Sequence, residues 1–496
     1  NAPNQLGVPN AFVYILRTTN PMDLPPITSG IPDGGTSCDR CESQDLGPVL
    51  VSGLTDATGA FALEGNIPVN TEFLLVMKVG RFRRAITYTL PETAACATTD
   101  LPATLPENPT RLPRDMMDGL GVNMPRIAVT TGAADGMECV LEKMGISHDE
   151  FANPGADGLA PQRVHLYQGG NVNPQMGAGG MGAGGTGGAG GLGGMGGAAG
   201  GKGGTGQNPG FGSSPGPKID NQTPPDREIY GDLARLQSYD IVVADCEGGG
   251  YDTNRTEAAA NGDSVREYVN RGGRFFASHL SYTWLVDNGT TPFDAADPIA
   301  TGLGPAAVWS NTADTGTQTA IGGVSLDRPQ ASPRIQNFAD WMVNEGITMA
   351  GVNTFSIIQP RSQVTTIGET TEEFVYETDG RMRVEQFSIN TPYGAPEDAV
   401  CGRVAYSGFH VAASDPTAVD VNANKIFPEH CTGDLSPQEK VLLYMLFDLN
   451  ACVGDPPIPP VCTPETCTTL GAECGFANDG CGNPLDCGPC PVPPPK

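Results

Sequence analysis

Two histidines end apolar runs of the sequence and are its best candidates for chemistry. His279 closes the run RFFASH and His410 closes CGRVAYSGFH, in a chain that contains only five histidines. An imidazole can hold a neighbouring cysteine as its thiolate, which is the nucleophilic form, so Cys246 beside either histidine would supply a nucleophile and a base. The full set of candidates at the ends of expected strands is Asp135, Glu138, Asp245, Cys246, Glu247, Ser278, His279 and His410.

These residues also have structural interpretations. Cys246 could form a disulfide with Cys139, on the preceding helix, and that bond would remove the thiol. His279 and His410 could be buried residues whose hydrogen bonds tie strand ends together, or metal ligands together with Glu247. We therefore assign no catalytic residue and keep as candidates His279, His410, Ser278 and Glu247. We expect no metal and no cofactor; the glycines at 248–250 lack the Lys-Ser/Thr pair of a phosphate-binding loop.

The elements that would position these residues alternate between strands and helices. Apolar runs predict strands at 126–132, 164–167, 239–247 and 274–279, and apolar residues at helical spacing predict helices at 136–145, 264–270 and 436–449, with a further helix near 340–342 and a hairpin over 373–387. Nearly continuous apolar strands separated by helices indicate a parallel sheet covered on both faces. Function in such a sheet gathers at the carboxyl ends of its strands.

The same order of runs resembles the trehalose-utilisation (ThuA-like) branch of the class I glutamine amidotransferase fold. The resemblance rests on YDIVV at 239–243, GGRFFASH at 272–279 and the run at 401–410 before a last helix, and it covers about 125–453 apart from an insertion. It implies an α/β domain. In the glutamine amidotransferases a nucleophilic cysteine follows the Gly-rich strand entry, whereas this chain has Ser278-His279 there. ThuA-like members also lack that cysteine and carry a histidine, so the resemblance lowers the expectation of an enzyme.

Residues 9 to about 118 differ from this pattern, because short strands are separated by turns. Runs at 11–16 and 73–79 are typical of strands, and TDATGAF at 55–61 places an Asp/Gly turn between two alternating runs. We predict a small β-sandwich. The turn, followed by Ile67-Pro68 and a strand, resembles the carboxypeptidase regulatory-like (transthyretin-type) domain. That resemblance implies a non-catalytic spacer or adhesion module.

A small basic group interrupts this acidic chain at Arg81, Arg83 and Arg84. We expect a solvated strand edge that charge keeps soluble, or a docking site for an acidic partner. The chain as a whole has 28 Lys and Arg against 56 Asp and Glu, a net charge of −28. Nucleic acid and anionic lipid would be repelled, so neither is an expected partner. The sequence has no apolar run of about 18 residues and no leader before Asn1, and we interpret it as a processed form without a transmembrane span.

The cysteines indicate an oxidising compartment. Of the 14 cysteines, six lie between Cys462 and Cys490, a density typical of a disulfide-stapled module. Zinc is the alternative for the two-residue spacing of Cys38 and Cys41 and of Cys487 and Cys490. The disulfide candidates are Cys38, Cys41, Cys139, Cys246, Cys401, Cys431, Cys452, Cys462, Cys467, Cys474, Cys481, Cys487 and Cys490, and Cys96 has no evident partner.

A glycine-rich insertion is the most distinctive segment. Residues 186–200 contain X-Gly-Gly triplets, and three is the period of a polyproline-II-like helix. Such a segment is either a flexible tether or a strand that packs against its own kind in an assembly. The cysteine module at the C-terminus would be a cap or anchor, or a glycan-binding knob, although Phe476 is its only aromatic residue.

We therefore predict a multidomain protein: an N-terminal β-sandwich, a central α/β parallel-sheet (amidotransferase-like) domain and a small disulfide-rich module. The expected boundaries are 1–118 for the β-sandwich, 119–454 for the ThuA-like α/β domain, 169–217 for the Gly-rich insertion within it, 455–461 for a Pro-rich linker and 462–496 for the module and tail. The expected function is that of a secreted, non-catalytic structural or adhesive surface protein that forms a homo-oligomer, fibre or layer and could bind a glycan. The alternative is a secreted ThuA-like enzyme acting on a carbohydrate or amide.

Overall fold

The N-terminal unit is built on one five-stranded antiparallel sheet. Its strands are β1 (Phe12–Leu16), β2 (Val49–Leu54), β3 (Glu72–Val79), β4 (Phe82–Thr89) and β5 (Leu120–Asn123), in the order β2-β1-β3-β4-β5. Alternation of side chains along the strands places Tyr14 and Leu74 in one apolar cluster and Ile15 and Leu75 in another, so that both faces are buried.

The structure, a computed structural model, describes residues 2–4, 6–41, 45–94, 97–101, 110–131, 136–155, 160–169, 222–246, 251–285, 306–310, 319–328, 331–358, 360–409, 434–454, 466–469, 474–478 and 484–489.

The predicted β-sandwich is wrong in one respect. Within the described part of this unit there is a single sheet, and loops rather than a second sheet cover its faces. Phe61 and Leu63, expected in a strand after the Asp/Gly turn, lie in irregular chain and pack on the second cluster. Apolar residues alternate here because one side of the chain packs on the sheet face. A loop that packs in this way shows the same alternation as a strand.

The second unit contains a mixed sheet of twelve strands. Six are parallel: β7 (Phe151–Ala152), β8 (Val164–Gln168), β6 (Ile127–Thr131), β9 (Ile241–Ala244), β10 (Arg274–Ser278) and β17 (Gly402–Ser407). The others continue the sheet with antiparallel pairing: β16 (Val384–Thr391), β15 (Thr371–Glu377), β12 (Thr319–Val324) and β13 (Thr354–Ile358), with β14 (Val364–Ile367) and β11 (Ala307–Trp309) branching from β16. The four predicted parallel strands are confirmed, and the predicted hairpin over 373–387 is the antiparallel pair β15 and β16. The sheet as a whole is mixed rather than parallel.

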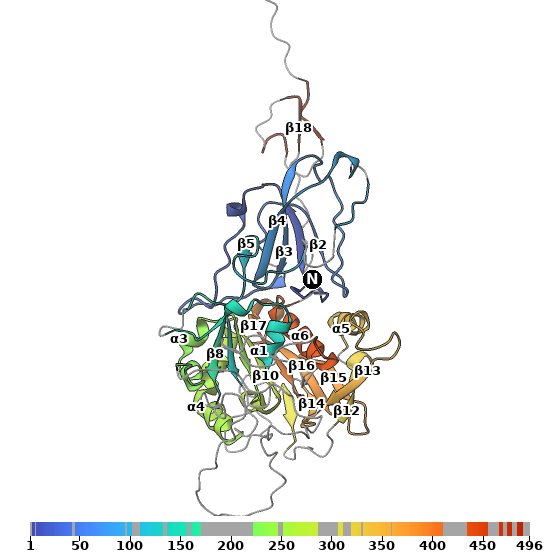
Figure 1. The fold of residues 1–496 in the computed structure, drawn as a ribbon. Helices are drawn as coiled ribbons and strands as arrows, with labels where there is room; N and C mark the ends of the chain where they lie inside the picture. Colours follow the sequence, from blue (N-terminus) through green and yellow to red (C-terminus); the bar gives the residue numbers. More distant parts are fainter. Residues whose placement is uncertain are drawn as a thin grey trace, which may run out of the picture.

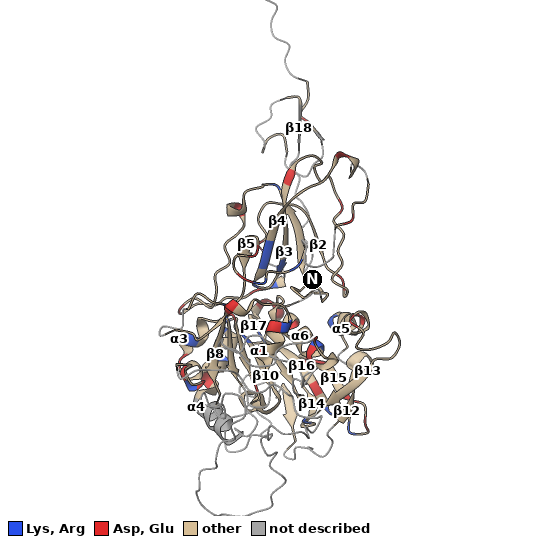
Figure 2. Cartoon of the chain, in the orientation of Figure 1, with Lys and Arg blue, Asp and Glu red and all other residues tan. Residues whose placement is uncertain are grey.

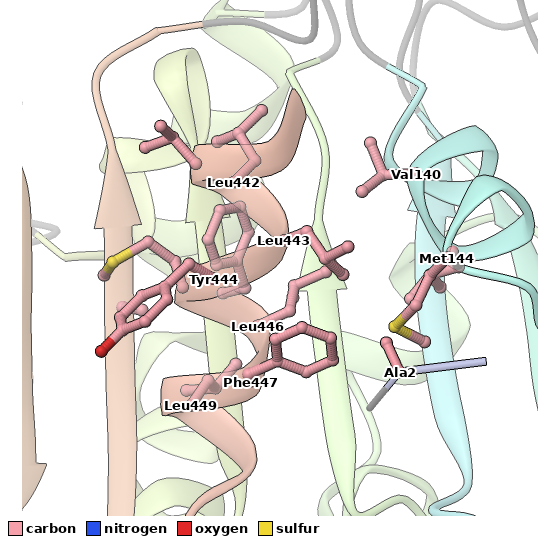
Figure 3. Close-up of a cluster of buried hydrophobic side chains, with 14 of the residues drawn as sticks. Ala2, Val140, Met144, Leu442, Leu443, Tyr444, Leu446, Phe447 and Leu449 are labelled. Carbon is pink, nitrogen blue, oxygen red and sulfur yellow. The ribbon is translucent and has the colours of Figure 1, made fainter. Parts of the chain in front are cut away.

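Helices cover both faces of this mixed sheet. The apolar residues of α1 (Met137–Lys143), α5 (Pro333–Asn344) and α6 (Pro437–Asn450) belong to one core cluster, and those of α2 (Arg227–Tyr230), α3 (Leu233–Gln237) and α4 (Tyr251–Asn270) belong to the other. In Figure 3, Leu443, Leu446 and Phe447 of α6 face Val140 and Met144 of α1. The 3-10 turns are η1 (Pro21–Asp23), η3 (Glu92–Ala94), η4 (His148–Glu150), η5 (His279–Trp284), η6 (Ser325–Asp327) and η7 (Glu397–Ala399).

The predicted start of α6 is confirmed. The Ser436 hydroxyl accepts a hydrogen bond from the backbone N–H of Glu439 at 3.2 Å, and the Glu439 carboxylate accepts one from the backbone N–H of Ser436 at 2.7 Å. This capping box satisfies two backbone donors that the helix leaves unpaired. We expect Ser436→Ala to lower the free energy of unfolding by about 1 kcal/mol. Urea denaturation followed by circular dichroism checks this value, with Ser436→Thr as the control because threonine keeps a capping hydroxyl; equal losses in the two variants would contradict it.

The two units share a continuous core at the amino edge of the parallel strands (Figure 1). Phe82 and Met124 of the first unit belong to the same apolar cluster as α1 and α6. The indole N–H of Trp341 in α5 donates to the Gly7 carbonyl at 2.8 Å. Asp240, just before β9, accepts backbone N–H groups of Gly30 and of Arg126, each at 2.7 Å. The first unit therefore closes the edge opposite the carboxyl ends of the strands.

Two disulfides fasten this junction. Cys38 is bonded to Cys401 and Cys41 to Cys452, across sequence separations of 363 and 411 residues. A zinc site at Cys38 and Cys41 is therefore wrong, because both sulfurs are used in disulfides. In the C-terminal module Cys467 is bonded to Cys487, beside the hairpin of β18 (Phe476–Asn478) and β19 (Pro484–Asp486).

The basic group at Arg81, Arg83 and Arg84 is not a solvated edge. β4 is an inner strand, and its basic segment lies toward the junction (Figure 2). Arg81 approaches Asp240 at 3.7 Å, Arg83 donates to the Gly121 carbonyl at 2.9 Å, and Arg84 donates to the Asp118 carbonyl at 2.8 Å. The acidic surface that these arginines meet belongs to the same chain.

The glycine-rich insertion leaves and re-enters the fold at one point. Gln168 at the end of β8 accepts a hydrogen bond from Asp226 N–H at 2.9 Å and donates to the Pro224 carbonyl at 2.8 Å. The predictions for its packing lie outside the described residues, as do those for Cys96, Cys431, Cys462, Cys481 and Cys490 and for the linker at 455–461. In the part of the chain that is described, no helix has the length and apolar character that crossing a bilayer requires.

Candidate thiol–imidazole site

The register of the sheet brings three strand ends together at its carboxyl edge. Ala244 of β9 lies beside Ala277 of β10, and Ser278 of β10 lies beside Ser407 of β17. Two residues beyond Ala244 lies Cys246, and one residue beyond Ser278 and Ser407 lie His279 and Gly408. Parallel pairing thus places two of the predicted candidates, Cys246 and His279, side by side.

Cys246 and His279 are in direct contact. The Cys246 Sγ lies 3.4 Å from His279 Nδ1, and Cys246 is completely buried. Among the described cysteines Cys246 alone keeps its thiol, whereas Cys139 is disulfide-bonded elsewhere. The predicted Cys139–Cys246 disulfide, and Cys246 as a disulfide candidate, are therefore wrong. Adjacent helix and strand do not guarantee that two cysteine side chains meet, since Cβ atoms must point toward each other.

His279 has an unusual backbone conformation. Its φ is +46°, in the left-handed region that residues other than glycine seldom adopt. Such residues collect at functional sites, where the surrounding structure holds them. Here the ring is turned toward the thiol, and the Tyr406 hydroxyl donates to the His279 carbonyl at 3.4 Å. The sequence signal for this conformation is absent, since histidine at a strand end is ordinary.

The structure describes three of the other predicted residues, Asp245, Ser278 and Glu138. Asp245 accepts the backbone N–H of Met137 at the start of α1, at 3.3 Å, and its carbonyl accepts the Ser281 hydroxyl at 2.7 Å. Ser278 is fully buried at the end of β10, and Glu138 is fully buried in α1. Asp135, Glu247 and His410 lie outside the described residues.

Sequence reasoning missed two buried carboxyl groups at the same edge. Because β16 runs antiparallel to β17, its beginning lies at the carboxyl edge, where Gln386 faces Ser407. Glu385 accepts the backbone N–H of Ser362 at 3.1 Å, and the Ser362 hydroxyl donates to Glu377 of β15. Burial raises the pKa of Glu385 well above its usual range, and the charge of Glu377 raises it further. Both effects favour the neutral form of the Glu385 carboxyl.

Gly408 makes room for this carboxyl group. A Cβ atom at position 408 would lie 2.5 Å from Glu385 Oε2. The Gly408 N–H donates to the Glu385 carbonyl at 2.6 Å, and the Gly408 carbonyl accepts the Arg361 N–H at 2.8 Å. The backbone of Gly408 thus joins Glu385 and Arg361 to the strand beside His279.

Tyr406 connects the two sides of the site. Burial raises the pKa of its phenol well above the usual value, the Arg361 charge lowers it, and Glu385, Tyr282 and Cys246 raise it. The Tyr406 hydroxyl therefore lies within electrostatic reach of those four groups. Trp309 packs on Tyr406 and on Tyr282 with ring centroids 5.2 Å apart in each case. The described residues contain no group of three or more side chains that could hold a metal ion.

The comparisons with known proteins add no relative. No family model matches the chain, and no curated protein and no solved structure matches it either. The chemistry of the site must therefore be argued from its own atoms.

Proposed function

We propose that this chain is an exported hydrolase or acyltransferase that uses Cys246 as its nucleophile on an amide or ester. The observation that carries the proposal is the contact of 3.4 Å between the Cys246 thiol and the His279 imidazole at the carboxyl edge of the parallel strands. Ligands of α/β sheets bind at this edge. The disulfides at the junction support export, because such bonds persist in oxidising compartments. The resemblance to the ThuA-like branch is compatible with this position of the site.

The reaction would proceed in two steps. His279 Nδ1 takes the proton of the Cys246 thiol, and the sulfur attacks the acyl carbon. The bond to the leaving amine or alcohol breaks, and the protonated imidazole returns a proton to it. Water or a second acceptor then releases the acyl group from the thioester, and the thiol is restored.

The test uses the full chain and an activated ester. With p-nitrophenyl acetate we expect release of p-nitrophenol and an acetyl group on Cys246, seen by intact mass and peptide mapping. Cys246→Ser should abolish the acetylated species, and His279→Gln should reduce its rate of formation by about 10²-fold or more. His148→Gln is the matched control, because His148 lies at Glu142 away from this edge.

The pH profile separates catalysis from simple thiol chemistry. Wild-type acylation should persist below the pKa of about 8.5 of an ordinary thiol, because the imidazole supplies the base. An unacylated Cys246 in folded protein, or a wild-type rate equal to that of His279→Gln at every pH, would refute the proposal.

A structural role in an exported assembly is the second candidate. The two disulfides and the shared core at the junction favour it, since the first join the two units covalently and the second packs them together. Size-exclusion chromatography and negative-stain microscopy of native protein test this candidate. Filaments or layers would support it, whereas a monomer over the whole concentration range would remove it.

A further inference from the structure

A buried arginine near the Cys246–His279 pair has no anionic partner among the described residues. Arg361 is 5% exposed, and its guanidinium carbon lies 4.5 Å from the centroid of the Tyr282 ring. Its Nε is buried without a hydrogen bond, and none of the ion pairs in the described part of the chain includes Arg361. A buried charge without a partner is strongly unfavourable, so an anionic ligand that pairs with this guanidinium would be bound tightly.

The backbone fixes Arg361 at the carboxyl edge. Its N–H donates to the Gly408 carbonyl at 2.8 Å, and Gly408 follows Ser407, which is in register with Ser278. Tyr282, on which the guanidinium stacks, belongs to the 3-10 turn η5 that begins at His279. Arg361 and the Cys246–His279 pair are thus attached to neighbouring strand ends.

The two nearby carboxyl groups do not neutralise Arg361. Glu385 is fully buried, burial raises its pKa well above the usual range, and no ion pair joins it to Arg361 in the described part of the chain. Glu377 is engaged by the Ser362 hydroxyl and by Arg381, at 3.2 Å. The guanidinium of Arg361 therefore remains a local positive charge in a chain whose net charge is −28.

We propose that Arg361 binds a carboxylate group of the substrate and so places the acyl carbon against Cys246. A guanidinium presents two parallel N–H donors that match the oxygens of a carboxylate, and stacking on an aromatic ring fixes its plane. The substrate class is then an amide or ester that also carries a carboxylate. This inference rests on the proposed function, because it uses the same nucleophile.

Two alkylating reagents that differ in charge test the inference in the full-length protein. Iodoacetate carries a carboxylate and iodoacetamide does not; with either one the Cys246 sulfur bonds to the methylene carbon and iodide leaves. We expect iodoacetate to label Cys246 with saturation, and succinate to protect the thiol. In Arg361→Met the ratio of the iodoacetate rate to the iodoacetamide rate should fall about tenfold. In Arg361→Lys this ratio should fall less, because lysine keeps the charge but lacks the paired donors. Arg271→Met is the control, since Arg271 pairs with Glu267 at the end of α4.

The outcomes separate the two proposals. If neither reagent labels Cys246 in folded protein, the proposed function fails. If iodoacetamide labels it but the rate ratio is the same in wild type and Arg361→Met, the assignment of Arg361 alone is overturned. Should Arg361→Met fail to fold, the wild type decides, because linear iodoacetate kinetics without succinate protection overturn the assignment. Protection by inorganic phosphate and not by succinate would overturn the choice of a carboxylate.

Discussion

Replacing Cys41 and Cys452 together with alanine is expected to lower the free energy of unfolding by about 4 kcal/mol. The bond joins residues separated by 411 positions, but the Cys38–Cys401 bond already closes most of that loop. With that bond intact, the second disulfide closes a loop of about fifty residues, for which the chain-entropy model gives roughly 4 kcal/mol. The pair sits where backbone bonds also cross the junction, from Cys41 N–H to the Val453 carbonyl at 2.9 Å.

Guanidinium denaturation followed by tryptophan fluorescence measures this loss, because Trp341 lies in the shared core. The matched control is Cys467→Ala with Cys487→Ala, since that disulfide spans 20 residues within the C-terminal hairpin module. The control should leave the main transition in place. A loss below about 1 kcal/mol in the Cys41 and Cys452 variant would mean that the core holds the junction without this bond.

The second large effect concerns acid stability and depends on His165. This residue of β8 is fully buried, and its Nδ1 contacts the Tyr239 hydroxyl at 2.8 Å. Burial lowers the pKa of His165 to about 4, and the positive charges of Arg126 and Arg163 add to the effect. In the unfolded chain the same imidazole titrates at about 6.5.

The direction of the pH effect on stability follows from the number of protons that the folded and unfolded states bind. Between about pH 6.5 and 4 the unfolded chain binds a proton that the folded protein does not, so stability falls as the pH is lowered. The difference between the folded and unfolded pKa values of His165 corresponds to roughly 3 kcal/mol of unfolding free energy, at about 1.4 kcal/mol for each pH unit. Above about pH 6.5 His165 is neutral in both states and contributes no pH dependence.

Two variants that cannot titrate should remove this dependence. His165→Gln can keep a hydrogen bond to Tyr239, and His165→Phe cannot, so their stabilities at pH 7 will differ. Both should nevertheless lose less stability than the wild type between pH 7 and pH 4, by about 3 kcal/mol. Urea denaturation at each pH gives the values. Parallel pH profiles for the wild type and both variants would show that His165 keeps an ordinary pKa when folded.

Local sequence patterns predicted the strands β6, β8, β9 and β10 and the helices α1 and α6, but only the end of α4 and neither α2 nor α3. The apolar runs that became β6, β9 and β10 are buried on both faces, which gives them a continuous signal. The start of α6 was also predictable, since Ser436, Pro437 and Glu439 act through neighbouring backbone groups. Signals of this kind need no knowledge of distant residues.

The candidate site was predictable only in part, for a reason of geometry. Cys246 and His279 follow two strands of strong apolar pattern, so their placement at one edge could be inferred. Glu377 and Glu385 lie in the predicted hairpin over 373–387 and Arg361 precedes it, but only the antiparallel pairing of β16 with β17 brings these residues to the same edge. No local feature of the sequence encodes that pairing.

By itself, the sequence determined the buried parallel strands β6, β9 and β10, the capped helix α6 and the presence of many disulfides, because each depends on residues close along the chain. The tertiary structure alone decided which sulfurs bond. It left Cys246 as a thiol beside His279, and it turned Arg81, just before β4, and Arg83 and Arg84 of β4 toward acidic and carbonyl groups of the same chain. Such outcomes depend on side chains meeting across hundreds of residues, and only the packed core sets those distances.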